Sequence, residues 1–515
     1  MLELTVMFVL ALAPIVWLIV ALCGLHMEAH KASIGAFVVA AVCALAIWHM
    51  DAFDLLTAAL EGMLMAIWPI VIVIVAAVFT YNLTVHTGAM ETIKGMLCSV
   101  SCDRRVLVLL IGWCFGAFLE GMAGFGTAVA IPASMLVALG VSPVTAILSC
   151  LVANGVPTMF GSIGIPTTTL ASITGLDAIQ LALTQAVQVI PFVIACPIIM
   201  VCLVGGGPRA LKGATGAALV AGVSFAVPEV LAAALIGPAL ADVVASVCSL
   251  GATFAYGLAT HSREVPEEHR LQSGTDAAPQ ASAGEKLRAW SPFLLIFLVL
   301  LLPSQLVPAI HDPLSSIATT VNAYSGDPSA TLTFTWVNTP GVLILACGIV
   351  GGVIQRCPAR EMLAVMGETC KQMSKTVITM LGVLACAKVM GYSGMIASIA
   401  AFFVAALGPL YPLVAPLLGA LGTFVTGSGT SSEVLFGNVQ LQAATTLGVD
   451  PTWLVASNSL GVSAGKMLSP QNIAIGCSAV GLVGQDGKVM GSVAMWAFAF
   501  AAAMSVLVFV GSLVL

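Results

Sequence analysis

The chain has 515 residues, of which 60% are hydrophobic and only 8% are charged, whereas soluble globular chains carry about 25% charged residues. A mean hydropathy of +1.09 over the whole length excludes a soluble globular domain and indicates that lipid surrounds much of the surface. No basic stripe or nucleic-acid-binding motif accompanies the net charge of −6, so no nucleic-acid partner is expected.

Apolar runs of about 20 residues recur along the chain and predict membrane-spanning helices. Full spans are expected near residues 4–25, 32–50, 63–83, 186–205, 212–226, 230–258, 290–310, 337–355, 376–391 and 489–515. Glycine, proline and polar residues interrupt four further apolar stretches. Two of these are predicted to be re-entrant hairpins (105–140 and 410–447), and two are predicted to be broken helices (143–177 and 451–482). The run 4–25 lacks a basic flank and is long enough to span, so it is predicted to be a helix and not a signal peptide.

The interrupted stretches of the two halves resemble each other. The spacing Asn-x6-Gly-x4-Pro begins at Asn154 and again at Asn458. Two further matches lie in the same order: residues 124–127 with 427–430, and residues 139–143 with 447–451. All of them keep an offset of 303 to 308 residues, which indicates an internal duplication.

Lysine and arginine predict the orientation, because they are enriched in cytoplasmic loops. Fifteen of the 17 fall in six short stretches, whereas the expected loops 51–62 and 311–336 contain acids and no Lys or Arg. If each hairpin enters and returns and each broken helix crosses once, every basic stretch lies on the cytoplasmic side. This arrangement has about twelve crossings, both termini outside, and two repeats of opposite orientation.

The sequence therefore predicts an all-α polytopic membrane protein with two inverted repeats, an arrangement typical of secondary transporters. The expected segments are the first repeat (1–180), additional helices (181–258), a cytoplasmic linker (259–289), the second repeat (290–482) and a C-terminal helix (489–515). The 14 cysteines show no CxxC pair or zinc-type spacing with histidine, so neither a metal nor a cofactor is expected.

Each predicted hairpin has a glycine-rich tip. Glycine-rich breaks at membrane depth are tolerated where they line a cavity, and the helix N-termini beside them favour an anion such as a carboxylate. The expected substrate-binding residues in the tips and breaks are Gly124, Gly126, Thr127, Asn154, Gly161, Gly427, Ser428, Gly429, Thr430, Ser431 and Asn458. The alternative is that these small residues only allow helices to pack closely.

Two basic residues, Lys388 and Lys466, lie outside the loops. Because a cation inside the membrane is costly, each is a candidate functional residue. Lys466 lies in the second broken helix and is expected to bind a substrate carboxylate, or else to pair with Glu433 or Glu120. Lys388 is expected to be a substrate-binding or structural charge, or to snorkel to the interface.

Three acids are expected at membrane depth. Glu120 lies at a hairpin tip and is the first candidate for the residue that carries a coupling proton, with Glu433 as the second candidate. The alternative for Glu120 is a helix-capping or ion-paired acid. Asp242 is expected to pair with another group or to snorkel.

Four segments are similar to the L-lactate permease family, which includes glycolate permeases: residues 116–127, 153–157 with 160–166, 426–432 with 435–437, and 465–471. The resemblance covers most of the chain. It implies proton-coupled uptake of L-lactate, D-lactate and glycolate across a bacterial-type inner membrane, and a place among the hairpin-bearing elevator carriers of the ion-transporter superfamily. The chain departs from the family pattern at Gly429, where an acid is common, and at Glu433, where an amide is common. These departures leave the coupling residue and the coupling ion, H+ or Na+, open.

Other functions remain as alternatives. A sodium-coupled carboxylate carrier of the same superfamily is the nearest one, and a passive anion channel is another. A membrane-embedded enzyme would require a catalytic constellation such as paired histidines and acids, and the sequence has no such pattern, so no enzymatic activity is expected. Substrate preference and oligomeric state are not predicted.

Overall fold

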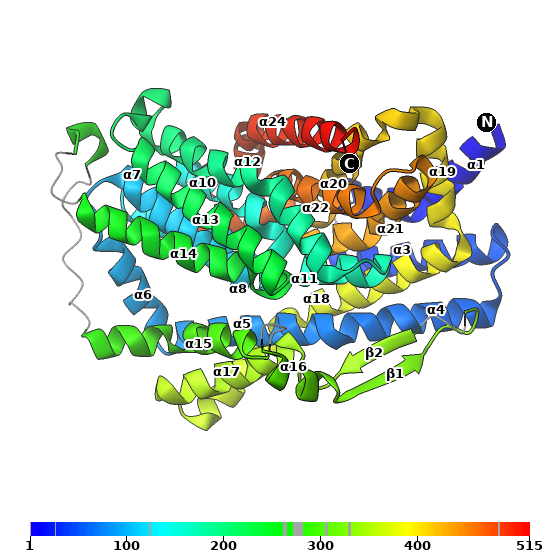
Figure 1. The fold of residues 1–515 in the computed structure, drawn as a ribbon, viewed down its shortest axis with the longest axis horizontal. Coiled ribbons are helices and arrows are strands. Elements are labelled where there is room, and N and C mark those ends of the chain that lie inside the picture. The colour runs from blue at the N-terminus through cyan, green and yellow to red at the C-terminus, as the bar shows by residue number, and fades with distance from the viewer. Residues whose placement is uncertain are drawn as a thin grey trace.

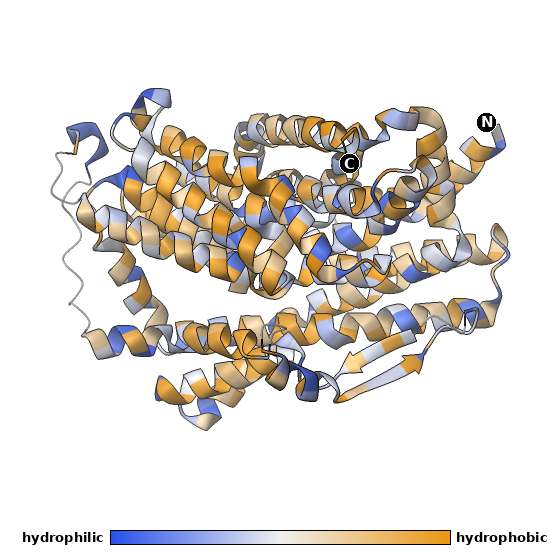
Figure 2. Ribbon diagram, viewed as in Figure 1, coloured by the Kyte–Doolittle hydropathy of each residue, from blue (hydrophilic) through white to orange (hydrophobic). Residues whose placement is uncertain are grey.

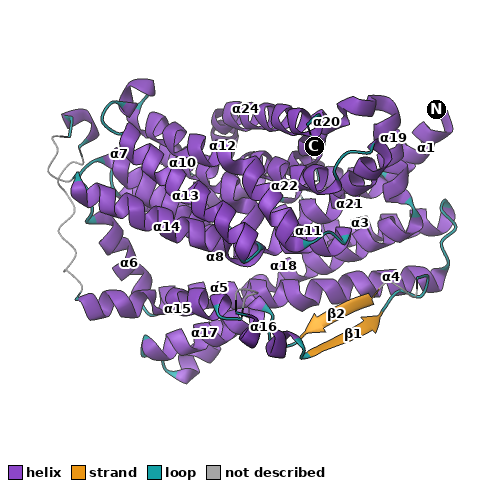
Figure 3. Ribbon diagram, viewed as in Figure 1, coloured by secondary structure: helices purple, strands orange, loops and turns teal. Residues whose placement is uncertain are grey.

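A computed structural model describes residues 2–25, 27–122, 124, 126–260, 265–270, 282–303, 307–327, 331–482 and 485–514. Within these ranges the chain is helical apart from loops and one antiparallel pair of strands, β1 (Ala318–Asn322) and β2 (Thr331–Thr335) (Figure 1, Figure 3). The all-α prediction therefore missed a small sheet, which lies within the expected loop 311–336. About half of the expected linker 259–289 lies outside the described residues, as do Ala123 and Phe125 of the first hairpin tip.

Ten helices of the described ranges are long and apolar enough to cross a membrane, or eleven if a bent pair near the N-terminus is one span. Their outer faces are apolar (Figure 2). On α13 (Thr215–Leu235), for example, Val223, Val227 and Leu231 are exposed and follow one another at helical spacing. An apolar stripe that faces outward is typical of a helix in contact with lipid.

One helical run near the start of the chain is much longer than expected. α1 (Leu2–Ala11) and α2 (Ala13–Ile19) form the bent pair, and α3 (Ala29–Ala46) follows. α4 (Ala52–Met65), η2 (Ala66–Val71) and α5 (Ile72–His86) then form a run of 35 residues. The predicted loop 51–62 is therefore wrong, because Asp51 caps α4 by accepting a hydrogen bond from the backbone of Phe53.

The first interrupted region has two packed helices followed by a broken one. After the short α6 (Ala89–Cys98), the run α7 (Arg104–Leu107), η3 (Val108–Phe115) and α8 (Gly116–Met122) packs against α9 (Thr127–Ala138). The next helix consists of α10 (Pro143–Gly155), η4 (Val156–Phe160) and α11 (Gly161–Thr174). It breaks where Ser162, Ile163 and Gly164 take positive φ angles, and this break lies inside the predicted stretch 143–177.

The middle of the chain contributes helices at positions close to the predicted spans. These are α12 (Ala178–Gly205), α13, α14 (Pro238–Ala259), α15 (Ala283–Leu301) and α17 (Pro340–Ile354), with short 3-10 turns η5 (Pro208–Leu211) and η6 (Glu267–His269) between them. The short α16 (Pro308–Ser315) lies mostly within the expected loop 311–336 and was not predicted.

The second half repeats the same succession of elements. Its members are α18 (Ala359–Ser393), α19 (Met395–Leu407), η7 (Gly408–Leu410), α20 (Tyr411–Thr426), α21 (Gly429–Leu447), α22 (Pro451–Leu468), α23 (Pro470–Ala479) and α24 (Asp486–Ser512). A 35-residue helix, a short helix, a packed pair, a broken helix and a helix of 27 or 28 residues thus occur in this order twice. The short α19 was not predicted.

Helices from both halves pack into one body (Figure 1). α11 packs on α21, α12 packs on α22, and α18 packs on α3 and α4, beside the layer that contains α5, α15 and α17. α20 and α22 approach closely because Gly461 and Gly465 face the α20 backbone; a Cβ on Gly465 would lie 2.1 Å from the carbonyl oxygen of Ala420. Gly465 is therefore a position at which the two helices pack closely.

Candidate functional site

A cavity of about 530 Å³ lies where the interrupted regions of the two halves meet. Its volume falls within the range of small-molecule sites. Most of its wall comes from the two hairpin turns and the two helix breaks, and the remainder comes from α18, the segment before α3 and the first residues of α3. The lining residues from the hairpins and breaks are Glu120, Gly126, Thr158, Gly161, Ser162, Ile165, Pro166, Val425, Thr426, Gly427, Ser428, Gly429, Thr430, Lys466, Pro470, Gln471, Asn472 and Ile475.

Four helix N-termini meet at this cavity. α9 begins after Gly126, α21 begins at Gly429, α23 begins at Pro470, and the regular part of α11 begins after Gly164. Residues of all four starts line the cavity. Helix N-termini carry unpaired backbone N–H groups and a partial positive charge, so their convergence favours an anion.

Lys466 and Glu120 form a buried ion pair in the wall of the cavity. The ammonium Nζ donates to Glu120 Oε1 at 2.5 Å, and the side chains are only 8% and 3% exposed. Asn154 Nδ2 donates to the other carboxylate oxygen at 2.7 Å. The alternative partner that the sequence left open for Lys466 is therefore Glu120 and not Glu433.

The absence of a side chain at Gly161 leaves room for the carboxylate of Glu120. A Cβ on Gly161 would lie 2.6 Å from Glu120 Oε1, the oxygen that accepts from Lys466. Even the smallest side chain would move the carboxylate. The break in the first broken helix thus determines the position of the ion pair.

A second carboxylate–amide pair lies outside the cavity wall. Asn458 Nδ2 donates to Glu433 Oε2 at 2.8 Å, and both residues are fully buried. The pair repeats the Asn154–Glu120 contact, but its acid comes from the second helix of its hairpin whereas Glu120 comes from the first. The two pairs are therefore not equivalent positions of the duplication.

The structure brings eight of the predicted residues into the cavity wall and places seven elsewhere. The eight are Glu120, Gly126, Gly161, Gly427, Ser428, Gly429, Thr430 and Lys466. Those that do not line it are Gly124, Thr127, Asn154, Ser431, Asn458, Glu433 and Lys388. Of these seven, Asn154 contacts the wall indirectly, because it donates a hydrogen bond to Glu120, which lines the cavity.

Lys388 pairs with an acid that the sequence interpretation had assigned to a loop. Its Nζ donates to Glu61 Oε1 at 2.7 Å, and the Tyr392 hydroxyl donates to Glu61 Oε2 at 2.9 Å. Glu61 is buried in α4 and Lys388 lies on α18. The ion pair therefore links α4 and α18.

The sequence did not point to the residues on the other side of the cavity. Glu28, His30 and Lys375 line it, and Lys375 donates to Glu28 in an ion pair that is half exposed. This hydrogen bond lowers the pKa of Glu28. Because the partners are 347 residues apart, no sequence pattern could have joined them.

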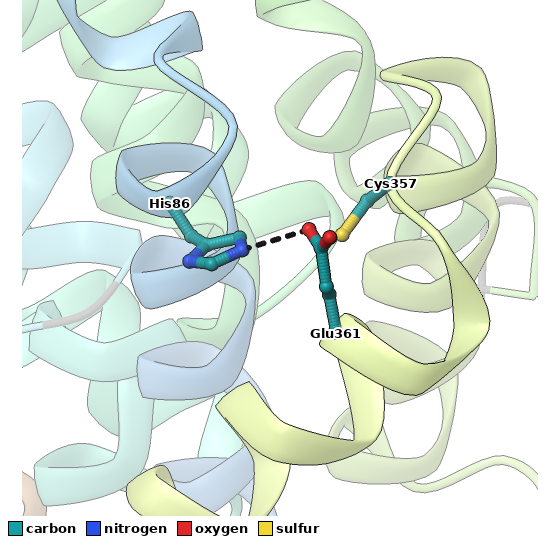
Figure 4. A group of neighbouring side chains, drawn as sticks. All are labelled: His86, Cys357 and Glu361. Carbon is teal, nitrogen blue, oxygen red and sulfur yellow. Dashed lines mark hydrogen bonds and ion pairs between the residues drawn. The ribbon is translucent and has the colours of Figure 1, made fainter.

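A further group of side chains joins the end of α5 to the start of α18. His86 Nε2 lies 3.1 Å from Glu361 Oε2, and the thiol of Cys357 is close to both (Figure 4). Nitrogen, sulfur and oxygen donors of this kind suit zinc. None of the three residues lines the cavity. The histidine and cysteine are distant in sequence, so the zinc-type spacing sought in the sequence could not reveal this group.

Comparisons with known proteins identify the family of the chain. A family model described as L-lactate permease matches residues 7–515. An L-lactate permease of Streptococcus iniae is 40% identical over 88% of this chain and 94% of its own length, and a glycolate permease of Escherichia coli strain K12 is 33% identical over 98% and 96%.

The fold also has a counterpart among solved structures. MtrF of Neisseria gonorrhoeae, described as one of a class of antimetabolite efflux pumps, superposes with a TM-score of 0.51 at 14% identity, covering 94% of this chain and 95% of that protein. This likeness concerns the fold alone. The match over nearly the whole length shows that the chain belongs to the L-lactate permease family, a family of multi-pass membrane transporters and not of enzymes.

Proposed function

We propose that this protein is a secondary active transporter that takes up L-lactate and related small 2-hydroxymonocarboxylates, including D-lactate and glycolate, together with protons across a bacterial-type inner membrane. The names of its relatives point to lactate and glycolate. The observation that carries the proposal is the buried Lys466–Glu120 pair in a cavity where four helix N-termini meet.

The cavity has the chemistry that a small hydroxycarboxylate requires. The helix N-termini and Lys466 attract the carboxylate. The side chains of Thr430, Gln471 and Asn472 line the same cavity and offer polar groups to the 2-hydroxyl. A substrate with a carboxylate and an adjacent hydroxyl can therefore engage both sets of groups at once.

The ion pair links substrate to proton. The ammonium group of Lys466 donates a hydrogen bond to Glu120. A substrate carboxylate competes for the ammonium, and Glu120 then loses its countercharge. A buried carboxylate without a partner is strongly unfavourable, so Glu120 takes up a proton. One proton thus accompanies each monocarboxylate, and Glu120 is the proton-coupling residue.

The repeated succession of elements supports two structural repeats. We propose repeat units of 52–205 and 359–512 in place of the expected 1–180 and 290–482, because the repeated succession begins at α4 and α18 and ends with α12 and α24. We retain about twelve crossings, with the basic ends cytoplasmic and both termini outside.

Contacts between basic stretches support this orientation. Arg105 donates to the carbonyl oxygens of Ala210 at 2.9 Å and Lys212 at 3.0 Å, and Asp103 forms a β-bridge with Arg270. Three basic stretches thus meet at one end of the molecule. A cysteine introduced at position 275 of a variant without reactive thiols should be labelled only from the cytoplasmic side, and labelling from outside would contradict the orientation.

Purified protein in liposomes tests the proposed function. A pH gradient, alkaline inside and without sodium, should drive accumulation of L-lactate above its external concentration, with D-lactate and glycolate as competitors and acetate, which lacks the hydroxyl, as a weaker one. Accumulation driven only by a sodium gradient would favour a sodium-coupled carrier of the same superfamily. Equilibration without accumulation under either gradient would favour a passive anion channel.

A further inference from the structure

Two buried acids take no part in the coupling proposed above. Glu229 on α13 and Asp242 on α14 have 0% and 1% exposed surface. Among the described residues, no hydrogen-bond donor reaches any of their four carboxyl oxygens. Glu229 was not among the acids expected at membrane depth. Asp242 was expected to pair or to snorkel, but it is buried and neither carboxyl oxygen has a hydrogen-bond partner among the described residues.

The two acids lie at about the same depth. α13 and α14 pack against each other and are joined by a tight turn at Ile236 and Gly237. Glu229 precedes this turn and Asp242 follows it, at similar distances along the two helices. The two acids are therefore at about the same level along the packed helices, and the charge of Glu229 acts on Asp242.

Asp242 faces the helix that carries Glu120. A Cβ on Gly121 would lie 2.5 Å from Asp242 Oδ2, so the carboxyl touches the backbone of the residue that follows Glu120. The charged and titratable groups whose fields act on Asp242 are Glu229, Glu120 and Lys466. The acid pair is thus placed directly behind the Lys466–Glu120 ion pair.

This placement determines the protonation of the pair. Lys466 is already neutralised by Glu120 at 2.5 Å. An ionised Asp242 or Glu229 would be a buried anion with neither a countercharge nor a hydrogen-bond donor, which is strongly unfavourable. Neither acid lines the cavity, so the ligand that reaches them is no larger than a proton.

We propose that Asp242 and Glu229 form a second proton-binding site, which holds the coupling proton before the substrate arrives and delivers it to Glu120. This inference rests on the proposed function. When the substrate carboxylate binds Lys466, the proton leaves Asp242 and binds Glu120, which becomes neutral. Asp242 is left as a carboxylate and regains a proton from Glu229, which is recharged from the aqueous side.

Transport by conservative variants tests the delivery step. Asp242→Asn in liposomes should exchange labelled lactate across the membrane at the wild-type rate, because the cavity is intact, but should lose accumulation driven by a pH gradient. Glu229→Gln should slow net uptake more than exchange. Ser246→Ala, on the same helix, should leave both processes unchanged. Wild-type accumulation by Asp242→Asn would overturn the proposal.

Infrared spectroscopy tests protonation separately from transport. Wild-type protein at neutral pH should show the C=O band of protonated carboxyl groups, and the band should decrease in Asp242→Asn and in Glu229→Gln but not in Ser246→Ala. If Asp242→Asn does not fold, the wild-type and Glu229→Gln spectra decide the result, and absence of the band overturns the proposal. Wild-type uptake that ignores the pH gradient would instead overturn the proposed function, and the band would still test the protonated pair.

Discussion

The ammonium group of Lys466 and the carboxylate of Glu120 lie 2.5 Å apart, although the residues are separated by 346 positions in the chain. Glu120 comes from the first hairpin and Lys466 from the broken helix of the second half. The pair therefore links the two halves of the molecule at the wall of the cavity. Binding of an anion to Lys466 changes the charge balance of both halves at once.

Lys466→Met should reduce both stability and binding, and a double variant separates the two effects. Removal of one partner of a buried ion pair typically costs about 3–5 kcal/mol of stability, and loss of a charge-assisted contact costs about 1.5–3 kcal/mol of binding. Lys466→Met combined with Glu120→Gln should recover thermal stability but still bind L-lactate at least tenfold more weakly. Near wild-type affinity in the stable double variant would mean that the helix N-termini bind the anion without the lysine.

Gly161→Ala should disrupt coupling without removing any charged group. The added methyl group would lie 2.6 Å from Glu120 Oε1 and displace the carboxylate from Lys466. Lactate uptake driven by a pH gradient should fall strongly. Gly251→Ala is the matched control, because a Cβ there meets no atom within 4 Å. Equal uptake by the two variants would show that the position of Glu120 is not critical.

Lys388→Met should affect stability and not lactate affinity. Its partner Glu61 would remain buried without a countercharge, and the loss should be about 3–5 kcal/mol. Lys388→Met with Glu61→Gln should restore much of the thermal stability, since Tyr392 still has an oxygen to bond. Lactate binding measured by calorimetry should match the wild type. A tenfold weaker affinity in the double variant would assign Lys388 to the substrate.

Hydropathy and the positions of basic residues predicted most of the spans but not the ends of the long helices. Residues 52–62 have enough acids to resemble a loop, yet Asp51 caps a helix that continues to His86. Helix caps and tertiary packing decide such boundaries, and hydropathy does not report them. The sheet at 318–335 was missed because its strands lie within a short polar segment.

The repeated glycine pattern predicted which turns form the cavity but not which side chains meet there. Gly126, Gly161 and Gly429 line it as expected, whereas Asn458 lies behind the wall. The Lys466–Glu120 pairing was one of two alternatives, and only the three-dimensional arrangement distinguishes Glu120 from Glu433. Glu229 was missed because it is a single acid within an apolar helix, without any neighbouring polar residue to mark it.

Proton movement with lactate in Glu120→Gln tests the central claim most directly. The variant mimics protonated Glu120, so it should exchange lactate across liposome membranes but neither accumulate it under a pH gradient nor move protons with it, as followed by a trapped pH-sensitive dye. Glu433→Gln is the matched control, because Glu433 is a buried acid that pairs with an asparagine but does not line the cavity. We expect proton movement to be lost in Glu120→Gln and retained in Glu433→Gln. If proton movement is retained in Glu120→Gln and lost in Glu433→Gln, the account is contradicted and coupling is assigned to the Asn458–Glu433 pair.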